Sequence, residues 1–224
     1  MLKRLAVVVP AHNEEGLLPD CLEAIEAAAG RFEGRTEVVV AADDCDDGTA
    51  TVAEAAGAEV VRLAARRVGA ARAAGFAHAL RHGTDGLWLA TTDADSLVAP
   101  DWLLWHAGHA ARGTEVLVGT VGVDDWTPWP VTVRDAYERH YRAALRHVHG
   151  ANLGCDARAY LRLGGFAAVP HDEDVDFVRR AVAGKLRVRY DAGSPVITSS
   201  RRHARAPSGF AAHLADLADE VSLR

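Results

Sequence analysis

Short apolar segments and longer amphipathic segments alternate along the first half of the chain. The apolar segments are rich in Val, Leu and Ala and end in polar turns, which is typical of buried strands. The segments between them place Ala, Leu and Arg at helical spacing. This alternation predicts an α/β fold with a mostly parallel central sheet and helices on both faces. The predicted strands are Leu5–Val9, Glu37–Ala41, Glu59–Leu63, Leu87–Thr91 and Val116–Val121, and the predicted helices are Leu17–Ala28, Thr49–Ala56, Gly69–Arg81 and Trp102–Arg112.

The second half of the chain is less regular. Loops on a rigid α/β platform commonly carry specificity, so we expect the acceptor side of a site here. Two tryptophans in one loop, Trp126 and Trp129, either stack on or cover a ligand or pack on the core. The predicted elements are a loop at Asp124–Pro130, a helix at Val131–Val148, a turn-rich segment at Gly150–Gly165, strands at Leu186–Tyr190 and Pro195–Thr198, and a final amphipathic helix from Ser208.

Composition narrows the class of protein. The 224 residues contain no Pro/Gly/Ser-rich linker, so we expect one domain spanning residues 1–224. No apolar run approaches the roughly 18 residues that cross a membrane, and the apolar start is too short for a signal peptide. Cys21, Cys45 and Cys155 have neither disulfide nor zinc spacing, which predicts reduced thiols and a cytoplasmic protein. The net charge of -6 argues against nucleic acid as a partner.

Two carboxylates directly follow the predicted strand Leu87–Thr91. Asp93 and Asp95 stand at the carboxyl end of this strand, where an open α/β sheet binds its ligand. Carboxylates at this spacing can bind a hard divalent cation and, through it, a diphosphate. The alternative is a polar loop in which Asp95 or Ser96 caps a helix. The spacing Asp-x-Asp occurs at 44/46, 93/95, 172/174 and 174/176, so only position in the fold can distinguish these pairs.

Several common site motifs are absent or incomplete. The segment 43–54 approaches a calcium-binding loop, but Cys45 stands at a ligand position and the segment follows a predicted strand instead of a helix. The glycine-rich dinucleotide and Walker patterns, Gly-x-Ser-x-Gly and His-Glu-x-x-His do not occur. The histidine pairs 78/82 and 106/109 could each touch one metal, but solvated histidines on a helix surface are the more frequent explanation.

Six weak motifs occur in a set order along residues 4–200. In this order they resemble the family 2 glycosyltransferases of the GT-A fold. The resemblance implies a nucleotide-sugar-binding half at about 1–122, an acceptor and catalytic half at about 123–207, and a C-terminal helix at 208–224. The motifs are Pro10-Ala-His-Asn-Glu-Glu15, Asp43–Thr49, Gly69-Ala-Ala-Arg72, Asp93-Ala-Asp95, Leu163-Gly-Gly-Phe166, and Glu173-Asp174-x-Asp176 followed by Arg179.

The resemblance also implies roles for individual residues. Asp95 would ligate Mn²⁺ or Mg²⁺ bridging the diphosphate, and His203 would be a further metal ligand or part of a basic surface tail. Asp174 would be the general base that deprotonates an acceptor hydroxyl opposite the leaving group, which is an inverting displacement. The partners implied are a nucleotide-diphospho sugar and an unidentified hydroxyl acceptor. The implied nucleotide-binding residues are Pro10, Ala11, Asn13, Glu14, Asp43, Arg72 and Asp93, with Asp43 accepting from a uracil-like N–H and Arg72 reaching the base or diphosphate.

Departures from the family pattern leave parts of this interpretation open. His12 stands where Tyr is frequent, Ala42 replaces an Asp and Ala73 replaces an Asn, so the nucleotide is unidentified. The Gln-x-x-Arg-Trp pattern of processive synthases is absent, and we therefore expect transfer of a single sugar. Two alternatives remain, a nucleotidyltransferase and a non-catalytic nucleotide-sugar-binding protein. Peripheral membrane contact through the tryptophan loop or the final helix also remains open.

Overall fold

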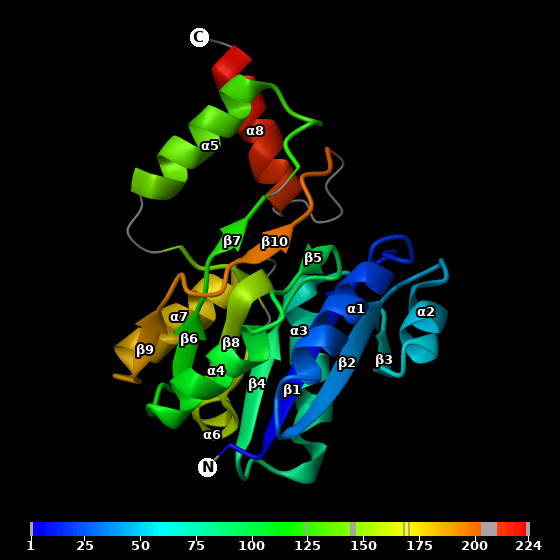
Figure 1. The fold of residues 1–224 in the computed structure, drawn as a ribbon, viewed down its shortest axis with the longest axis vertical. Helices are drawn as coiled ribbons and strands as arrows, with labels where there is room; N and C mark the ends of the chain where they lie inside the picture. Colours follow the sequence, from blue (N-terminus) through cyan, green and yellow to red (C-terminus); the bar gives the residue numbers. More distant parts are fainter. Residues whose placement is uncertain are drawn as a thin grey trace.

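A central seven-stranded sheet organises the computed structural model, which describes residues 2–123, 125–143, 147–167, 169, 171–202 and 210–222 (Figure 1). The strand order is β3-β2-β1-β4-β8-β6-β9. β8 runs antiparallel to both neighbours, and the other neighbouring pairs are parallel. The predicted α/β fold with a mostly parallel sheet is confirmed. The strands are β1 (Arg4–Ala11), β2 (Arg35–Asp43), β3 (Glu59–Leu63), β4 (Leu87–Thr91), β6 (Val116–Val118), β8 (Leu153–Asp156) and β9 (Val188–Tyr190).

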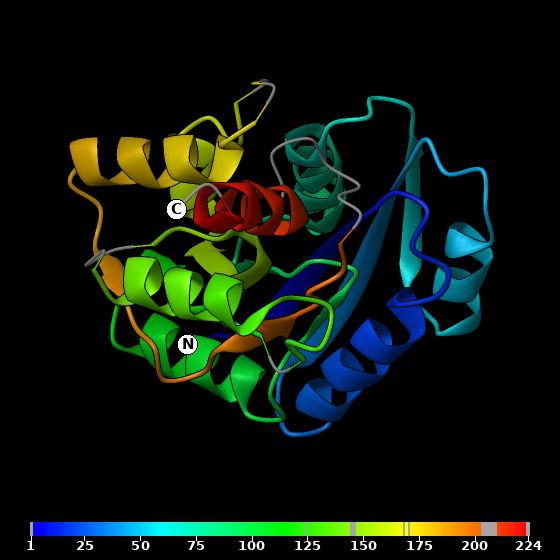
Figure 2. The same cartoon turned by 90° about the horizontal axis from the view of Figure 1, so that it is seen from above.

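Helices cover both faces of this sheet (Figure 2). Alternate residues of β1 face the two layers, since Leu5, Val7 and Val9 belong to one core and Ala6 and Val8 to the other. A strand buried on both faces explains the uninterrupted apolar run in the sequence. The first core includes α1 (Leu18–Ala29), α2 (Thr49–Ala55) and α4 (Trp102–Ala111), and the second includes α3 (Val68–Ala79), α6 (Ala157–Arg162) and α7 (Glu173–Ala183).

The predicted elements of the first half lie within two residues of the observed ones, except the strand Val116–Val121. That strand is wrong as one element, because β6 ends at Val118 and the chain enters a different sheet as β7 (Val121–Gly122). The predicted helix Val131–Val148 is too long, since α5 (Val131–Ala143) is followed by non-helical residues at 147–149. The segment Gly150–Gly165 contains β8 and α6, and α7 was not predicted.

A second, three-stranded sheet joins distant parts of the chain. β5 (Ser96–Leu97), directly after Asp95, pairs antiparallel with β10 (Val196–Thr198), so that Thr198 lies opposite Ser96. β7 pairs with β10 on the other side. This pairing brings the segment that follows β10 to the carboxyl end of β4.

α5 and α8 (Phe210–Ser222) form an arm above the two sheets (Figure 1). Trp129 is 9 % exposed within the small core of this arm, and its Nε1 donates to the Ser200 carbonyl at 2.6 Å. Trp126 packs near Tyr137, with ring centroids 5.5 Å apart. The two tryptophans therefore pack on a core, as one of the two predicted alternatives states. Across the ranges that the structure describes, every helix falls short of the length and apolar character that a membrane span requires.

Candidate active site

The carboxyl ends of β1, β2 and β4 meet at one edge of the central sheet. β1 lies between β2 and β4, so the strand order reverses between β1 and β4. Open α/β sheets bind ligands outside the carboxyl ends of their strands at such a point. The segments that end or follow these strands carry residues 10–14, Asp43 and Asp93 to Asp95. Sequence-predicted residues from three separate motifs therefore lie along one edge.

Arg72 lies at the centre of a buried ion-pair network. Its Nη2 donates to Asp93 Oδ1 at 2.6 Å, and its Nη1 donates to Glu173. Arg72 is 4 % exposed. Burial by itself lowers the pKa of Arg72, but Asp93, Glu173 and Asp174 together raise it above its ordinary value. Arg72 is therefore a permanent buried cation that links α3, the end of β4 and α7.

Two glycines allow this network to close. A Cβ at Gly150 would overlap the Arg72 guanidinium, and a Cβ at Gly69 would overlap the Glu173 side chain. Asp174 follows Glu173 in the first turn of α7, and its Oδ2 accepts the Gly150 backbone N–H at 2.6 Å. The carboxylate that the sequence proposes as general base is thus held beside the buried network.

Asp95 is a largely buried carboxylate just after β4. Its Oδ2 lies 2.9 Å from Arg201 Nη2, and its Oδ1 accepts from the hydroxyls of Ser96 at 3.3 Å and Thr198 at 3.5 Å. Burial and the nearby Asp93 and Glu14 raise the pKa of Asp95 to about 6, against the lowering effect of Arg201. A carboxylate in these surroundings gains stability from a positively charged partner.

Glu14 is bound by the same arginine. Arg201 donates from Nη1 to Glu14 Oε2 at 2.8 Å and from Nη2 to Oε1 at 2.7 Å, which is bidentate geometry. Glu14 is 5 % exposed. No individual role is predicted for Arg201 from the sequence. It belongs to a basic stretch at 201–205, but its place beside Glu14 and Asp95 depends on the pairing of β5 with β10. His203, the predicted further metal ligand, lies outside the described residues.

The turn after β1 is held by side chains of the turn after β2. Asn13 has a positive φ of 54°, and its Nδ2 donates to Asp46 Oδ1 at 2.6 Å while its Oδ1 accepts the Asp46 N–H at 3.0 Å. Pro10 and Ala11 are the last residues of β1, and the Ala11 carbonyl accepts from the Cys45 thiol at 3.4 Å. Hydrogen bonds therefore join the turns after β1 and β2 along one edge of the sheet.

Asp43 organises the loop between β3 and α3. Its Oδ1 accepts the backbone N–H groups of Ala65 at 2.6 Å and Arg66 at 2.9 Å, and its Oδ2 accepts that of Arg67 at 2.8 Å. An ionised carboxylate offers about four acceptor positions. Three of these bind the backbone of this loop, and Asp43 itself is only 3 % exposed.

The histidine pair His106 and His109 is buried, so the expectation of solvated helix-surface histidines is wrong here. Trp88 Nε1 donates to His106 Nδ1 at 3.0 Å. Burial, with a smaller contribution from His109, lowers the pKa of His106 to about 3. His106 is a neutral core residue that accepts a hydrogen bond.

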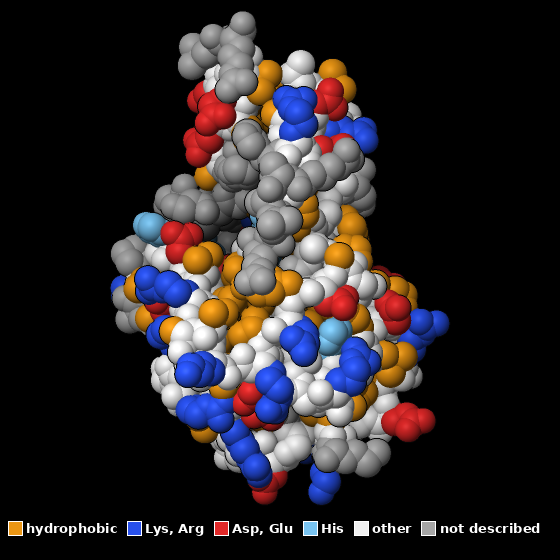
Figure 3. Space-filling view, turned by 90° about the vertical axis from the view of Figure 1, so that its left-hand side faces the viewer, with side chains coloured by type: hydrophobic (Ala, Val, Ile, Leu, Met, Phe, Trp, Pro, Cys, Tyr) orange, Lys and Arg blue, Asp and Glu red, His pale blue; other side chains and the backbone are white. Residues whose placement is uncertain are grey.

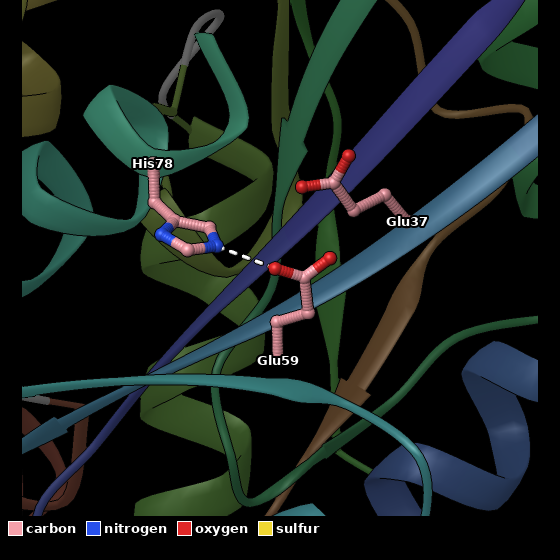
Figure 4. A group of neighbouring side chains, drawn as sticks. All are labelled: Glu37, Glu59 and His78. Carbon is pink, nitrogen blue, oxygen red and sulfur yellow. Dashed lines mark hydrogen bonds and ion pairs between the residues drawn. The ribbon is translucent and has the colours of Figure 1, made fainter. Parts of the chain in front are cut away.

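A further acidic cluster lies at the opposite end of the sheet. Glu37 and Glu59 stand near the amino ends of β2 and β3, and His78 Nε2 lies 2.6 Å from Glu59 Oε2 (Figure 4). The three side chains are close enough to hold a metal ion. Arg81 forms ion pairs with both glutamates, at 2.7 Å to Glu59, and so already supplies a cation. We therefore interpret this cluster as a group of ion pairs near the protein surface and not as a metal site.

Basic side chains are numerous on the lower part of one face, with acidic side chains among them (Figure 3). A small pocket of about 160 Å³ is lined by Arg112, Arg187 and Arg189. These arginines are exposed, and Arg187 lies 3.7 Å from Glu115. Solvated arginines at this end of the sheet are remote from the carboxyl edge, so we assign them no role in the site.

Solved structures with the same fold are glycosyltransferases of the GT-A type. TarS of S. aureus in complex with UDP-GlcNAc has a TM-score of 0.71 at 15% identity, covering 99% of this chain and 67% of that one. Glucosyl-3-phosphoglycerate synthase from Mycobacterium tuberculosis, in complex with Mn²⁺, UDP and glucosyl-3-phosphoglycerate, has a TM-score of 0.66 at 16% identity, covering 98% and 77%. At these identities the likeness shows the fold, and the predicted GT-A fold is confirmed.

The family follows from the sequence comparisons. The family model described as Glycosyl transferase family 2 matches residues 6–161. Undecaprenyl-phosphate 4-deoxy-4-formamido-L-arabinose transferases are 31% identical over 169 residues in Aeromonas hydrophila and 29% over 171 residues in Sodalis glossinidius, each alignment covering 72% of this chain. The chain belongs to glycosyltransferase family 2. It spans about half the length of these curated relatives, since the alignments cover 50% of each.

Proposed function

We propose that this chain carries the transfer chemistry of a metal-dependent, inverting and non-processive glycosyltransferase, which moves one sugar from a nucleotide-diphospho sugar to an acceptor hydroxyl. The observation that carries the proposal is the convergence of Asp93, Arg72 and Asp174 beside Asp95 at the carboxyl edge of the sheet. Family membership favours this function over a nucleotidyltransferase or a non-catalytic binding protein. We also propose a cytoplasmic location, which the three unpaired cysteines support.

In this proposal residues 1–122 form the donor half of a single domain and residues 123–207 the acceptor half. Pro10, Ala11 and Asn13 line the base and ribose. Asp43 acts mainly by shaping the loop at 64–67, and its remaining acceptor position is available to a uracil-like N–H. The UDP complexes of the structural neighbours make UDP the first nucleotide to test.

The chemistry of the Asp95 carboxylate suits it to binding a divalent cation. Its oxygens are hard ligands of the kind that Mg²⁺ and Mn²⁺ prefer, and it is a buried acid already paired with a cation, Arg201. When bound, the cation would stabilise the charge that develops on the departing diphosphate. Asp95 would hold it, with His203 the sequence-based candidate for a further ligand.

In the proposed transfer step Asp174 acts on the acceptor and Arg72 on the leaving group. Asp174 takes the proton of the acceptor hydroxyl while that oxygen forms a bond to the anomeric carbon. The bond from the anomeric carbon to the diphosphate breaks, and its electron pair leaves with the nucleoside diphosphate. Arg72 contributes a fixed positive charge beside the leaving group. Attack opposite the leaving group inverts the configuration.

A polyprenyl phosphate is a second candidate acceptor, because the curated relatives are named for undecaprenyl phosphate. A phosphate oxygen is already ionised at neutral pH and needs no general base. Asp174→Asn should therefore lower turnover by roughly 10² to 10⁴ with a hydroxyl acceptor and far less with a phosphate acceptor. Single-turnover rates of Asp174→Asn with an alcohol and with a short-chain prenyl phosphate measure the difference. If this variant kept the wild-type rate with both acceptors, Asp174 would not be the general base.

A nucleotide panel tests the donor site. UDP, GDP, TDP and CDP, with and without Mn²⁺, should include one ligand that stabilises the protein by about 2.7 kcal/mol at 100 times its dissociation constant. That stabilisation corresponds to a rise in melting temperature of roughly 5 to 10 °C. Asp95→Ala should remove the Mn²⁺-dependent part, whereas Asp85→Ala, an exposed carboxylate distant from this edge, should keep it. No shift with any nucleotide would reject the donor site.

A further inference from the structure

Arg201 forms ion pairs with Glu14 and Asp95, the two carboxylates to which we assign donor binding and metal binding. Its guanidinium lies 2.7 and 2.8 Å from the two oxygens of Glu14 and 2.9 Å from Asp95 Oδ2. The side chains of Arg201, Glu14 and Asp95 are 24, 6 and 14 % exposed. This ion triad is therefore partly sheltered from water, with Arg201 as its most exposed member.

β10 and the residues that follow it position this arginine. Thr198 pairs with Ser96, the residue after Asp95, and their hydroxyls lie 3.0 Å apart. The Ser199 N–H donates to the Asp95 carbonyl at 3.1 Å, and the Arg201 N–H donates to the Ser199 hydroxyl at 3.3 Å. The segment is anchored at Ser199, and Arg201 reaches the triad from just beyond that anchor.

One guanidinium nitrogen serves both carboxylates. Nη2 of Arg201 lies 2.9 Å from Asp95 Oδ2 and 2.7 Å from Glu14 Oε1. A positive charge between carboxylates relieves their mutual repulsion. A divalent cation bound to Asp95 would supply the same relief, and two cations at one carboxylate repel each other. Arg201 and a divalent cation therefore compete for Asp95.

We infer that Arg201 is a tethered counter-ion, which neutralises Asp95 and Glu14 while the donor site is empty and moves to the donor diphosphate when donor and divalent cation bind. This role rests on the proposed function. A guanidinium binds phosphate oxygens in bidentate geometry, so the diphosphate offers Arg201 a new partner. Arg201 thereby makes the binding of the divalent cation depend on the binding of the nucleotide.

Such a coupling is reciprocal, because each ligand must change the affinity of the other by the same factor. Mn²⁺ should bind weakly to the empty protein and more tightly in the presence of UDP. UDP should likewise bind more tightly in the presence of Mn²⁺. Loss of the Arg201 charge removes the competitor from the empty site and the phosphate partner from the loaded site, and both changes reduce the coupling.

Mn²⁺ binding, measured from the paramagnetic resonance signal of free Mn²⁺ at fixed pH with and without UDP, tests this inference. Arg201→Gln should bind Mn²⁺ alone about tenfold more tightly than the wild type, and the enhancement by UDP should shrink by a similar factor. Arg202→Gln is the matched control. It removes the same charge, but the Arg202 side chain donates to the Pro128 carbonyl and lies over the Trp129 ring.

Equal Mn²⁺ affinities of Arg201→Gln and Arg202→Gln would overturn the inference. If the wild type still bound Mn²⁺ in that case, the proposed function would be unaffected. No Mn²⁺ binding to any of these proteins would overturn both. Because Arg201→Gln alters the surroundings of the buried Glu14, a second pair covers a failure to fold. Glu14→Gln/Arg201→Gln should bind Mn²⁺ about tenfold more tightly than Glu14→Gln, and equal affinities there would also overturn the inference.

Discussion

Arg72 and Arg201 each bridge two carboxylates from distant parts of the chain, but their surroundings differ. The Arg72 side chain is 5 % exposed within a helix packed on the central sheet, whereas the Arg201 side chain is 24 % exposed and follows a three-residue strand. Moving Arg72 would leave Glu173 buried without its cation. Moving Arg201 should cost less, because its side chain is already partly exposed to water. The same ion-pair chemistry thus gives a fixed anchor in one region and an exchangeable partner in the other.

The largest expected effect comes from removing the anchor. Arg72→Met should lower the free energy of unfolding by about 3 to 5 kcal/mol, because it leaves Glu173 and Asp93 with uncompensated charge. Urea denaturation measures this loss. Arg66→Met, which removes an exposed arginine near the same helix, should change stability by less than about 1 kcal/mol. A loss below about 1 kcal/mol in Arg72→Met would mean that Arg72 is not an anchor.

His106 is also buried, but unlike Arg72 and Arg201 it has no carboxylate beside it, among the residues that the structure describes, to stabilise a positive charge. The pKa of His106 is about 3 in the folded protein because of burial, while an unfolded histidine titrates near 6.5. The unfolded state therefore binds more protons below pH 6.5, and stability falls as the pH decreases through this range. From pH 6.5 to 5.0 the loss from this group is about 2 kcal/mol.

Urea denaturation at the two pH values measures the loss for wild type and His106→Asn, whose amide can still accept from Trp88. The pH-dependent loss should be about 2 kcal/mol smaller in His106→Asn than in the wild type. His82→Asn removes a histidine from the protein surface and serves as the matched control. An unchanged slope in His106→Asn would contradict the buried neutral state.

Arg201→Gln should have a smaller effect on stability than Arg72→Met. We expect a loss of about 1 to 2 kcal/mol without ligands, since the charged hydrogen bonds to Glu14 and Asp95 are lost in a partly exposed place. Mn²⁺ should restore more of the melting temperature in this variant than in the wild type. A loss as large as that of Arg72→Met would remove the distinction between the two arginines.

The smallest effect is expected at the opposite end of the sheet. Arg81 pairs with Glu37 and Glu59 near the surface, and Arg81→Gln should cost less than about 1 kcal/mol. The difference from wild type should shrink further in 1 M salt, where charges more than about 3 Å apart are screened. Denaturation at low and high salt checks both statements. A larger, salt-independent loss would show that this cluster acts as a second anchor.

The donor edge could be predicted from the sequence because its strands are buried on both faces. β4 coincides with the predicted Leu87–Thr91, and the position of Asp93 and Asp95 after it followed directly. The second half was less predictable for a physical reason. β8 has four residues, and its Gly154 is required because a Cβ there would overlap Trp88 and His106. A strand that short shows no periodicity, so tertiary packing decides it.

α7 was missed for a different reason. The acidic residues at its start favour a helix N-terminus, where negative charge is stabilised, but we interpreted them only as candidate chemistry. Glu173 in particular has a structural partner, Arg72, that lies 101 positions away. Likewise, Arg201 and Glu14 are separated by 187 positions. Ion pairs across such separations have no signal in a single sequence.

The pairing of Ser96 with Thr198 also sets when the site is completed during synthesis. Residues of β1 to β4 leave the ribosome before those of β10 and can begin to fold while β10 is still to be made. A nascent chain that ends before Thr198 contains Asp93 and Asp95 but lacks Arg201. Residues translated after β10 therefore supply the charge that balances Glu14 and Asp95, which are made much earlier.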